Sequence, residues 1–142
     1  MTVVAPDTAA LAPSPGQRAS SAAIVATRAT TFLRAQAQWL RRGLEHADDA
    51  VALGIVLAAH DRSHERWVAH VRAIDDALGA TAAQAVSVVY SHLGRVAGSL
   101  ESGTWRLLAA DVGEQARQVV AERLTELTEQ TVDALWREAA LV

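Results

Sequence analysis

Two histidines lie four residues apart in the stretch AAHDRSHERW, which covers residues 58–67. On a helix, this spacing places His60 and His64 on one face, where two imidazoles can bind the same metal ion. A third ligand has to come from another helix, and Glu101 is the best placed, while Asp61 lies beside the pair in the sequence. These four residues are therefore a candidate site for a divalent metal ion, with activated water as its possible chemistry.

The same histidines also fit the buried face of an ordinary helix. They belong to a series with alternating steps of four and three residues, made of Leu53, Leu57, His60, His64, Trp67, Val71, Ile74 and Leu78. This spacing is typical of the seam of a helical bundle, so both imidazoles are predicted to point inward. Glu65, Trp67 and Trp105 are expected nearby, as ligand contacts or as polar members of the core. We favour core histidines over a metal site.

The segment DRSH, with Asp61 and His64, resembles the carboxylate-x-x-His half-motif of ferritin-like di-metal bundles. In that family, two helices each supply a carboxylate and the other two each supply a Glu-x-x-His pair. The resemblance covers four residues and the fold class. The chain departs from the pattern at EQAR, where Arg117 replaces the histidine, and no inward carboxylate precedes Glu45 or Glu101 on their helices. The resemblance therefore implies a degenerate ferritin-like site.

Composition excludes several other kinds of chemistry. The chain has no cysteine, which excludes thiolate zinc sites, thiol catalysis and disulfides. Its formal net charge is −3 and its arginines form no basic stripe, so we expect no binding to nucleic acid. The sequence also lacks a glycine-rich phosphate loop and a serine with an oriented base. We lean towards a protein without enzymatic activity, and the sequence leaves that question open.

The hydrophobic pattern predicts four helices in one domain, residues 20–142. The first is expected to begin at Ser20 or Ser21, and the ranges are about 20–46, 50–78, 81–101 and a fourth that extends to about residue 140. Residues 1–19 contain all three prolines and no helical periodicity, so they are expected to form a disordered, flexible tail.

The start of the fourth helix leaves two alternatives. It is either one continuous helix from Thr104, or a short helix over 104–110 followed by a restart. The restart is favoured by Gly113, which is unfavourable inside a helix, and by Asp111 with Glu114, which have the spacing of a capping box.

Short connections make successive helices antiparallel neighbours. The predicted fold is therefore all-α, an antiparallel up-down four-helix bundle with a flexible N-terminal tail. No window reaches the roughly 18 apolar residues of a membrane span. The N-terminus also lacks the basic region of a signal peptide. We expect no membrane association and a cytoplasmic location.

If the fourth helix is continuous, its last part extends beyond the third helix and carries an apolar surface. The candidate interface residues are Leu124, Leu127, Leu135 and Trp136. Such a surface needs cover from the start of the first helix, from a second copy or from a different partner. We therefore expect a non-enzymatic bundle that acts by self-association, as a homodimer, or by partner binding. The alternative is a bundle that binds a metal or small ligand at His60 and His64.

Overall fold

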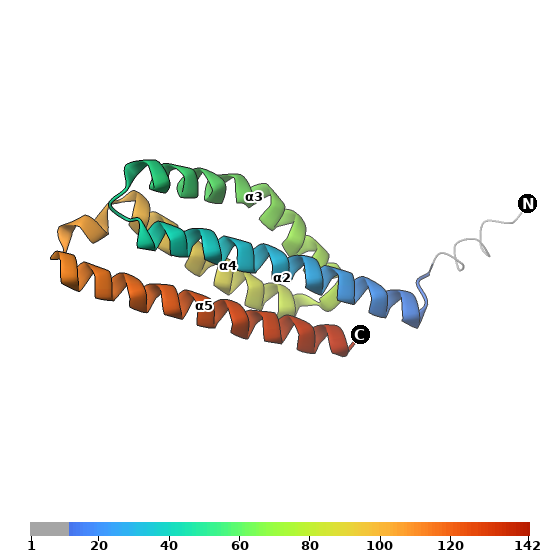
Figure 1. Cartoon of the computed structure of the whole chain (residues 1–142). Helices are drawn as coiled ribbons and strands as arrows, with labels where there is room; N and C mark the ends of the chain where they lie inside the picture. Colours follow the sequence, from blue (N-terminus) through green and yellow to red (C-terminus); the bar gives the residue numbers. More distant parts are fainter. Residues whose placement is uncertain (1–11) are drawn as a thin grey trace, which may run out of the picture.

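The computed structural model describes residues 12–142 and shows an all-α, antiparallel up-down four-helix bundle (Figure 1). Its long helices are α2 (Pro15–Glu45), α3 (Ala50–Leu78), α4 (Ala80–Glu101) and α5 (Ala110–Ala140), and a short 3-10 helix, η1 (Thr104–Leu107), precedes α5. The predicted fold class is thus confirmed. None of the helices in this described range is both long enough and apolar enough to cross a membrane.

The helices follow one another around the bundle in chain order. Each packs mainly against its neighbours in the chain, and α5 closes the bundle by packing along α2. The diagonal pairs, α2 with α4 and α3 with α5, make fewer contacts, and α3 and α5 make the fewest. As a result, α3 lies at one edge of the bundle (Figure 1).

Helix α2 begins earlier than predicted. Ser14 is its N-cap: the Ser14 hydroxyl accepts a hydrogen bond from the backbone N–H of Gln17 at 3.1 Å, and the Gln17 side chain accepts one from the Ser14 N–H at 2.7 Å. Pro15 occupies the first helical position, where its fixed φ is favourable. The predicted start at Ser20 or Ser21 is therefore wrong, and residues 15–19 are helical. The part of the predicted tail in residues 1–11 lies outside the described residues.

Of the two alternatives for the fourth helix, the restart is the correct one. Gly103, with a left-handed φ of 71°, follows the end of α4, and η1 leads into α5. The predicted capping box is not formed, because α5 begins at Ala110 and its N-cap is Ala109, which makes no side-chain cap. Gly113 lies buried in the first turns of α5, where a Cβ would stand 3.5 Å from the carbonyl oxygen of Trp105. This is an ordinary van der Waals distance, so the approach of η1 does not by itself require a glycine at this position.

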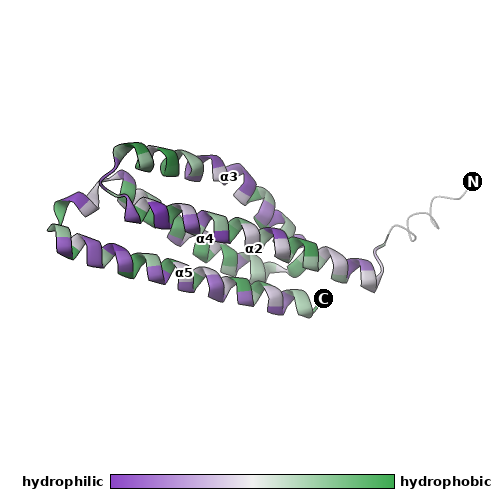
Figure 2. Cartoon of the chain, viewed as in Figure 1, coloured by the Kyte–Doolittle hydropathy of each residue, from purple (hydrophilic) through white to green (hydrophobic). Residues whose placement is uncertain are grey.

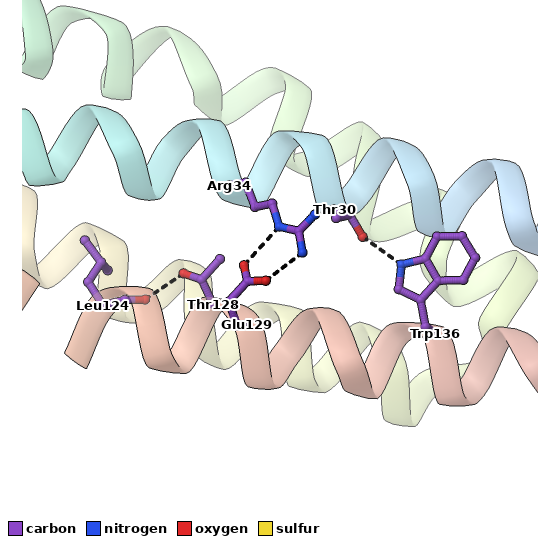
Figure 3. Close-up of polar contacts among 6 residues, drawn as sticks. All are labelled: Thr30, Arg34, Leu124, Thr128, Glu129 and Trp136. Carbon is purple, nitrogen blue, oxygen red and sulfur yellow. Dashed lines mark hydrogen bonds and ion pairs between the residues drawn. The ribbon is translucent and has the colours of Figure 1, made fainter. Parts of the chain in front are cut away.

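The C-terminal half of α5 packs against the middle of α2 (Figure 3). Arg34 donates two hydrogen bonds to the carboxylate of Glu129, at 2.9 and 2.6 Å. The indole N–H of Trp136 donates to the Thr30 hydroxyl at 3.2 Å, although 41% of Trp136 stays exposed. These hydrogen bonds help to hold α2 and α5, the two longest helices of the bundle, side by side.

This packing corrects the predicted interface. Leu124 and Leu135 are fully buried within the chain, and Leu127 is half-buried against the core. They are covered because α5 packs along α2, where Arg41 bonds to Thr125 next to Leu124 and Thr30 bonds to Trp136 next to Leu135. Of the expected interface residues, only Trp136 retains substantial exposure. The surface that motivated self-association in the sequence is therefore part of the bundle core.

Candidate functional site

The face that α3 presents to the core differs from the predicted one chiefly at two positions, where Val56 and Ser63 are buried rather than Leu57 and His64. Its fully or largely buried residues are Leu53, Val56, Ser63, Trp67, Ile74 and Leu78, with His60 half-buried between them. His64 is exposed. The prediction that His60 and His64 share the buried face is therefore wrong. Adjacent helical residues lie about 100° apart, so Ser63 in the seam turns His64 outward.

Ser63 links α3 to α4 through a short chain of hydrogen bonds. Its hydroxyl donates to the carbonyl oxygen of His60 at 2.6 Å and lies 2.8 Å from the Tyr90 hydroxyl. Because the single Ser63 hydroxyl proton is used on the carbonyl, Tyr90 is the donor in the second bond. The fully buried serine is thus satisfied on both sides.

Aromatic rings surround this pair. The Trp67 ring stacks on Tyr90 with centroids 4.3 Å apart and an interplanar angle of 11°, and His60 stacks on Tyr90 at 5.8 Å. Phe32 of α2 lies 6.1 Å from Tyr90. We call Phe32, His60, Ser63, Trp67 and Tyr90 the Tyr90 cluster. It joins three helices through stacking and one hydrogen-bonded serine, an arrangement that fixes their register.

The predicted metal site is not assembled. Asp61, Glu65 and Glu101 are exposed, as is His64. Across residues 12–142, no group of three or more histidine, aspartate or glutamate side chains is placed to hold a metal ion. The other predicted polar contact, Trp105, donates its indole N–H to the Ser99 hydroxyl at 3.2 Å. Of the predicted site residues, the structure brings together only His60 and Trp67, in the Tyr90 cluster.

His60 is nevertheless an unusual group. Its Nδ1 atom is buried and makes no hydrogen bond in the described structure. Burial lowers the pKa of the imidazole, with a smaller contribution from His64 in the same direction, and Asp61 opposes the shift. The lowered pKa favours the neutral ring at physiological pH.

A different feature of α3 stands out on the surface. The ten residues Ala50–Ala59 contain no polar side chain, and Figure 2 shows these first turns as the most hydrophobic part of the helix. Leu53 and Val56 point into the core, but Val51 is 75% exposed and Ile55 is 54% exposed. Gly54 is also exposed, and no atom lies within 4 Å of a Cβ placed on it.

We define Val51, Gly54, Ile55 and the half-buried Ala58 as the α3 apolar face. Their spacings of three, four and seven residues place them on one side of the helix. The polarity of the exposed side chains changes abruptly after this face. From Asp61 onward, the exposed positions of α3 are mostly charged: Asp61, Arg62, Glu65, Arg66, Arg72, Asp75 and Asp76. The second half of α3 is therefore an ordinary amphipathic helix, whereas the first half is apolar on both its inner and outer sides.

The seam pattern missed both Ser63 and the α3 apolar face. Ser63 lies seven residues after Val56 and three after His60, a helical spacing that was open to detection. The apolar face gave no periodic signal, because a segment without polar residues has no preferred side. Comparison of the chain with protein-family models, with curated proteins and with solved structures gives no match.

Proposed function

We propose that this protein is a non-enzymatic helical-bundle protein that acts by self-association, with two copies meeting at the α3 apolar face. The observation that carries the proposal is the exposure of Val51 and Ile55 in a segment that has no polar side chain. A helix that is apolar all round is normally covered on all sides. Among the helices of residues 12–142, α3 is covered by α2 and α4, with slight contact to α5.

Gly54 gives separate support. A glycine in the middle of an exposed helix is less stable than an alanine by roughly 0.5–1 kcal/mol, because it loses more backbone entropy on folding. Nothing in the described part of the chain requires a glycine here, since no atom of residues 12–142 lies within 4 Å of where its Cβ would stand. A second helix that packs closely against this face would explain both the missing side chain and the apolar neighbours.

A second copy is the occupant that the surrounding charges favour. Exposed Asp48 precedes the face, and exposed Arg62 follows it four residues after Ala58, on the same side of the helix, while Asp61 lies about 100° round the helix from Arg62. This side of α3 therefore carries opposite charges at its two ends. Such a surface is complementary to itself when one copy is turned around, which is the symmetry of a two-fold dimer. The expected cytoplasmic location belongs to the same proposal.

The size of the face predicts a weak dimer. Eight residues from Val51 to Ala58 span about 12 Å of helix, which is a small contact beside the roughly 800 Å² per partner of stable complexes. We therefore expect dissociation constants on the order of micromolar or weaker.

Analytical ultracentrifugation across the micromolar concentration range tests the proposal. The wild-type chain should move from monomer to dimer as its concentration rises, and Ile55→Lys should stay monomeric. Val119→Lys is the matched control, because Val119 is a 65% exposed aliphatic residue on α5, away from the face. A wild-type chain that stays monomeric throughout, or an Ile55→Lys variant that dimerises like wild type, would overturn it.

A second candidate, binding of a metal ion or small ligand at His60, is favoured by one observation, the buried Nδ1 atom without a partner. Elemental analysis of protein purified without chelators or a histidine tag tests the metal. A stoichiometric metal that is lost in His60→Ala would support this candidate. A metal content near zero, unchanged in His60→Ala, would exclude the metal.

A further inference from the structure

The α3 apolar face has an internal order of large and small residues. Along the helix it reads Val51, Gly54, Ile55, Ala58, so its midpoint falls between Gly54 and Ile55. When two copies of this face are placed antiparallel about that midpoint, Ile55 of one copy lies opposite Gly54 of the other, and Val51 lies opposite Ala58. Each large aliphatic side chain then meets a small residue, as close packing between helices requires.

The same arrangement places opposite charges together. Asp48 lies in the turn just before Asp49, the N-cap of α3, at one end of the face, and Arg62 lies about one helical turn after Ala58, at the other end. In the antiparallel pair, the turn that carries Asp48 in one copy therefore lies beside the end of the face that carries Arg62 in the other. Two-fold symmetry repeats this contact at the other end.

Both residues are available for this contact. Asp48 and Arg62 are exposed, and neither forms an ion pair within residues 12–142. The neighbouring Asp49 is engaged as the N-cap of α3, where its carboxylate accepts hydrogen bonds from the N–H groups of Val51 and Ala52. The acidic end of the face is therefore Asp48.

We infer that two copies of this chain pair through α3 in an antiparallel, two-fold arrangement centred between Gly54 and Ile55, with reciprocal Asp48–Arg62 contacts that set its direction and register. This inference rests on the self-association proposed above and adds the geometry of the dimer. In a parallel pair, Asp48 would face Asp48 and Arg62 would face Arg62, so the charges oppose that alternative.

Charge reversal tests the register. Asp48→Arg and Arg62→Asp each create two like-charge contacts in the antiparallel dimer, so each should raise the dissociation constant by about fivefold or more at low salt. The double variant Asp48→Arg with Arg62→Asp restores opposite charges at both ends and should return to within about twofold of wild type. High salt should reduce the differences.

Asp76→Arg and Arg72→Asp are matched controls. They make the same changes in net charge at exposed positions of α3, remote from the face, and they should leave dimerisation close to wild type. Circular dichroism establishes that every variant is folded.

The outcomes separate the two claims. If Ile55→Lys abolishes the dimer but the single charge reversals leave it unchanged, or if the double variant is as weak as the single variants, the antiparallel register is wrong and the α3 interface stands. If the wild-type chain never dimerises, the proposed function fails, and the register fails with it.

Discussion

The hydroxyl of Tyr90 donates a hydrogen bond to Ser63 across the interface between α4 and α3, with the oxygens 2.8 Å apart. Ser63 is fully buried, and its own proton goes to the carbonyl oxygen of His60 at 2.6 Å. A polar residue of α3 is thereby accommodated in the core without an unsatisfied hydroxyl. With Ser63 turned inward in this way, His64 lies on the exposed side of α3.

Removal of the Tyr90 hydroxyl should weaken the fold. Tyr90→Phe keeps the stacking on Trp67 but leaves Ser63 with one hydrogen bond, so we expect a loss of about 1 kcal/mol in the free energy of unfolding. Urea denaturation measures this loss in the free energy of unfolding. A double-mutant cycle should show that the effects of Tyr90→Phe and Ser63→Ala on this free energy are coupled. Ser87→Ala is the control, since that half-buried hydroxyl of α4 bonds only to the Ala83 carbonyl. Equal stability of Tyr90→Phe and wild type would refute the role of this bond.

The stability of the fold should fall as the pH is lowered from neutral. Burial lowers the pKa of His60, His70 and His92 below the ordinary value of 6.5, and in each case it is the largest cause. The unfolded chain therefore binds more protons than the folded chain below about pH 6.5, which favours unfolding. Stability is at its full value above this pH, and the loss continues until the pH falls below the lowered pKa values.

Denaturation at about pH 7.5 and about pH 5.5 measures this effect, and both values lie above the range in which Glu129 titrates. His60→Gln should reduce the difference between the two pH values, with the exposed His64→Gln as the control on the same helix. A free energy of unfolding that stays constant or rises on acidification would contradict the burial of these imidazoles.

Gly54→Ala should have opposite effects on folding and on association. In the monomer, the new Cβ enters open space and should stabilise α3 by roughly 0.5–1 kcal/mol. In the dimer it would stand where Ile55 of the second copy approaches, so the dissociation constant should rise several-fold. Gly94→Ala is a closely matched control, because Gly94 is also exposed in a helix with open space around it. Gly94→Ala should stabilise the fold as much as Gly54→Ala and leave the dissociation constant of the dimer unchanged. An equal change in the dissociation constant for both variants would show that the interface lies elsewhere.

Replacement of Gly43 by alanine should destabilise the fold, the reverse of the effect expected for Gly54→Ala. A Cβ at Gly43 would stand 2.7 Å from Leu100 Cδ1 and 3.2 Å from Val56 Cγ1, because α2, α3 and α4 meet closely at this level. Gly43→Ala is therefore expected to lower the free energy of unfolding by about 1–3 kcal/mol, as overpacking does. Thermal denaturation beside Gly94→Ala measures it. Gly43→Ala that is as stabilising as Gly94→Ala would show that the core has room at this point.

Much of the fold was predictable because local signals agree with the packing. Helix α3 begins after Asp49 and ends before Gly79, as its caps and periodicity indicate. The rotation of α3 was harder to predict, because the expected and observed seams share Leu53, His60, Trp67, Ile74 and Leu78. The two series differ in whether Val56 or Leu57, and Ser63 or His64, is the more buried residue. The hydroxyl of Tyr90 on another helix satisfies Ser63 in its inward position, and the sequence of α3 alone does not contain that partner.

The start of α2 and the interface were mispredicted for different reasons. The segment Ser14-Pro15-Gly16-Gln17 has a capping-box spacing and a proline at the first helical position, but its proline resembled those of a tail. The interface was mispredicted because the end of the fourth helix was compared with the shorter third helix, whereas α5 packs along α2 and is bonded to it at Thr30 and Arg34. This packing buries Leu124 and Leu135, so the candidate interface moves to α3, where Val51 and Ile55 lie in a segment too uniformly apolar to reveal its outer side.

The most direct test of the central claim uses the absence of cysteine from the sequence. Ile55→Cys introduces a single thiol at the centre of the proposed interface, and Val119→Cys introduces one at a similarly exposed position on α5. Under mild oxidation at a concentration where the wild-type chain self-associates, Ile55→Cys should form a disulfide-linked dimer much faster than Val119→Cys. Equal, slow cross-linking of the two variants would contradict a dimer that meets at the α3 apolar face.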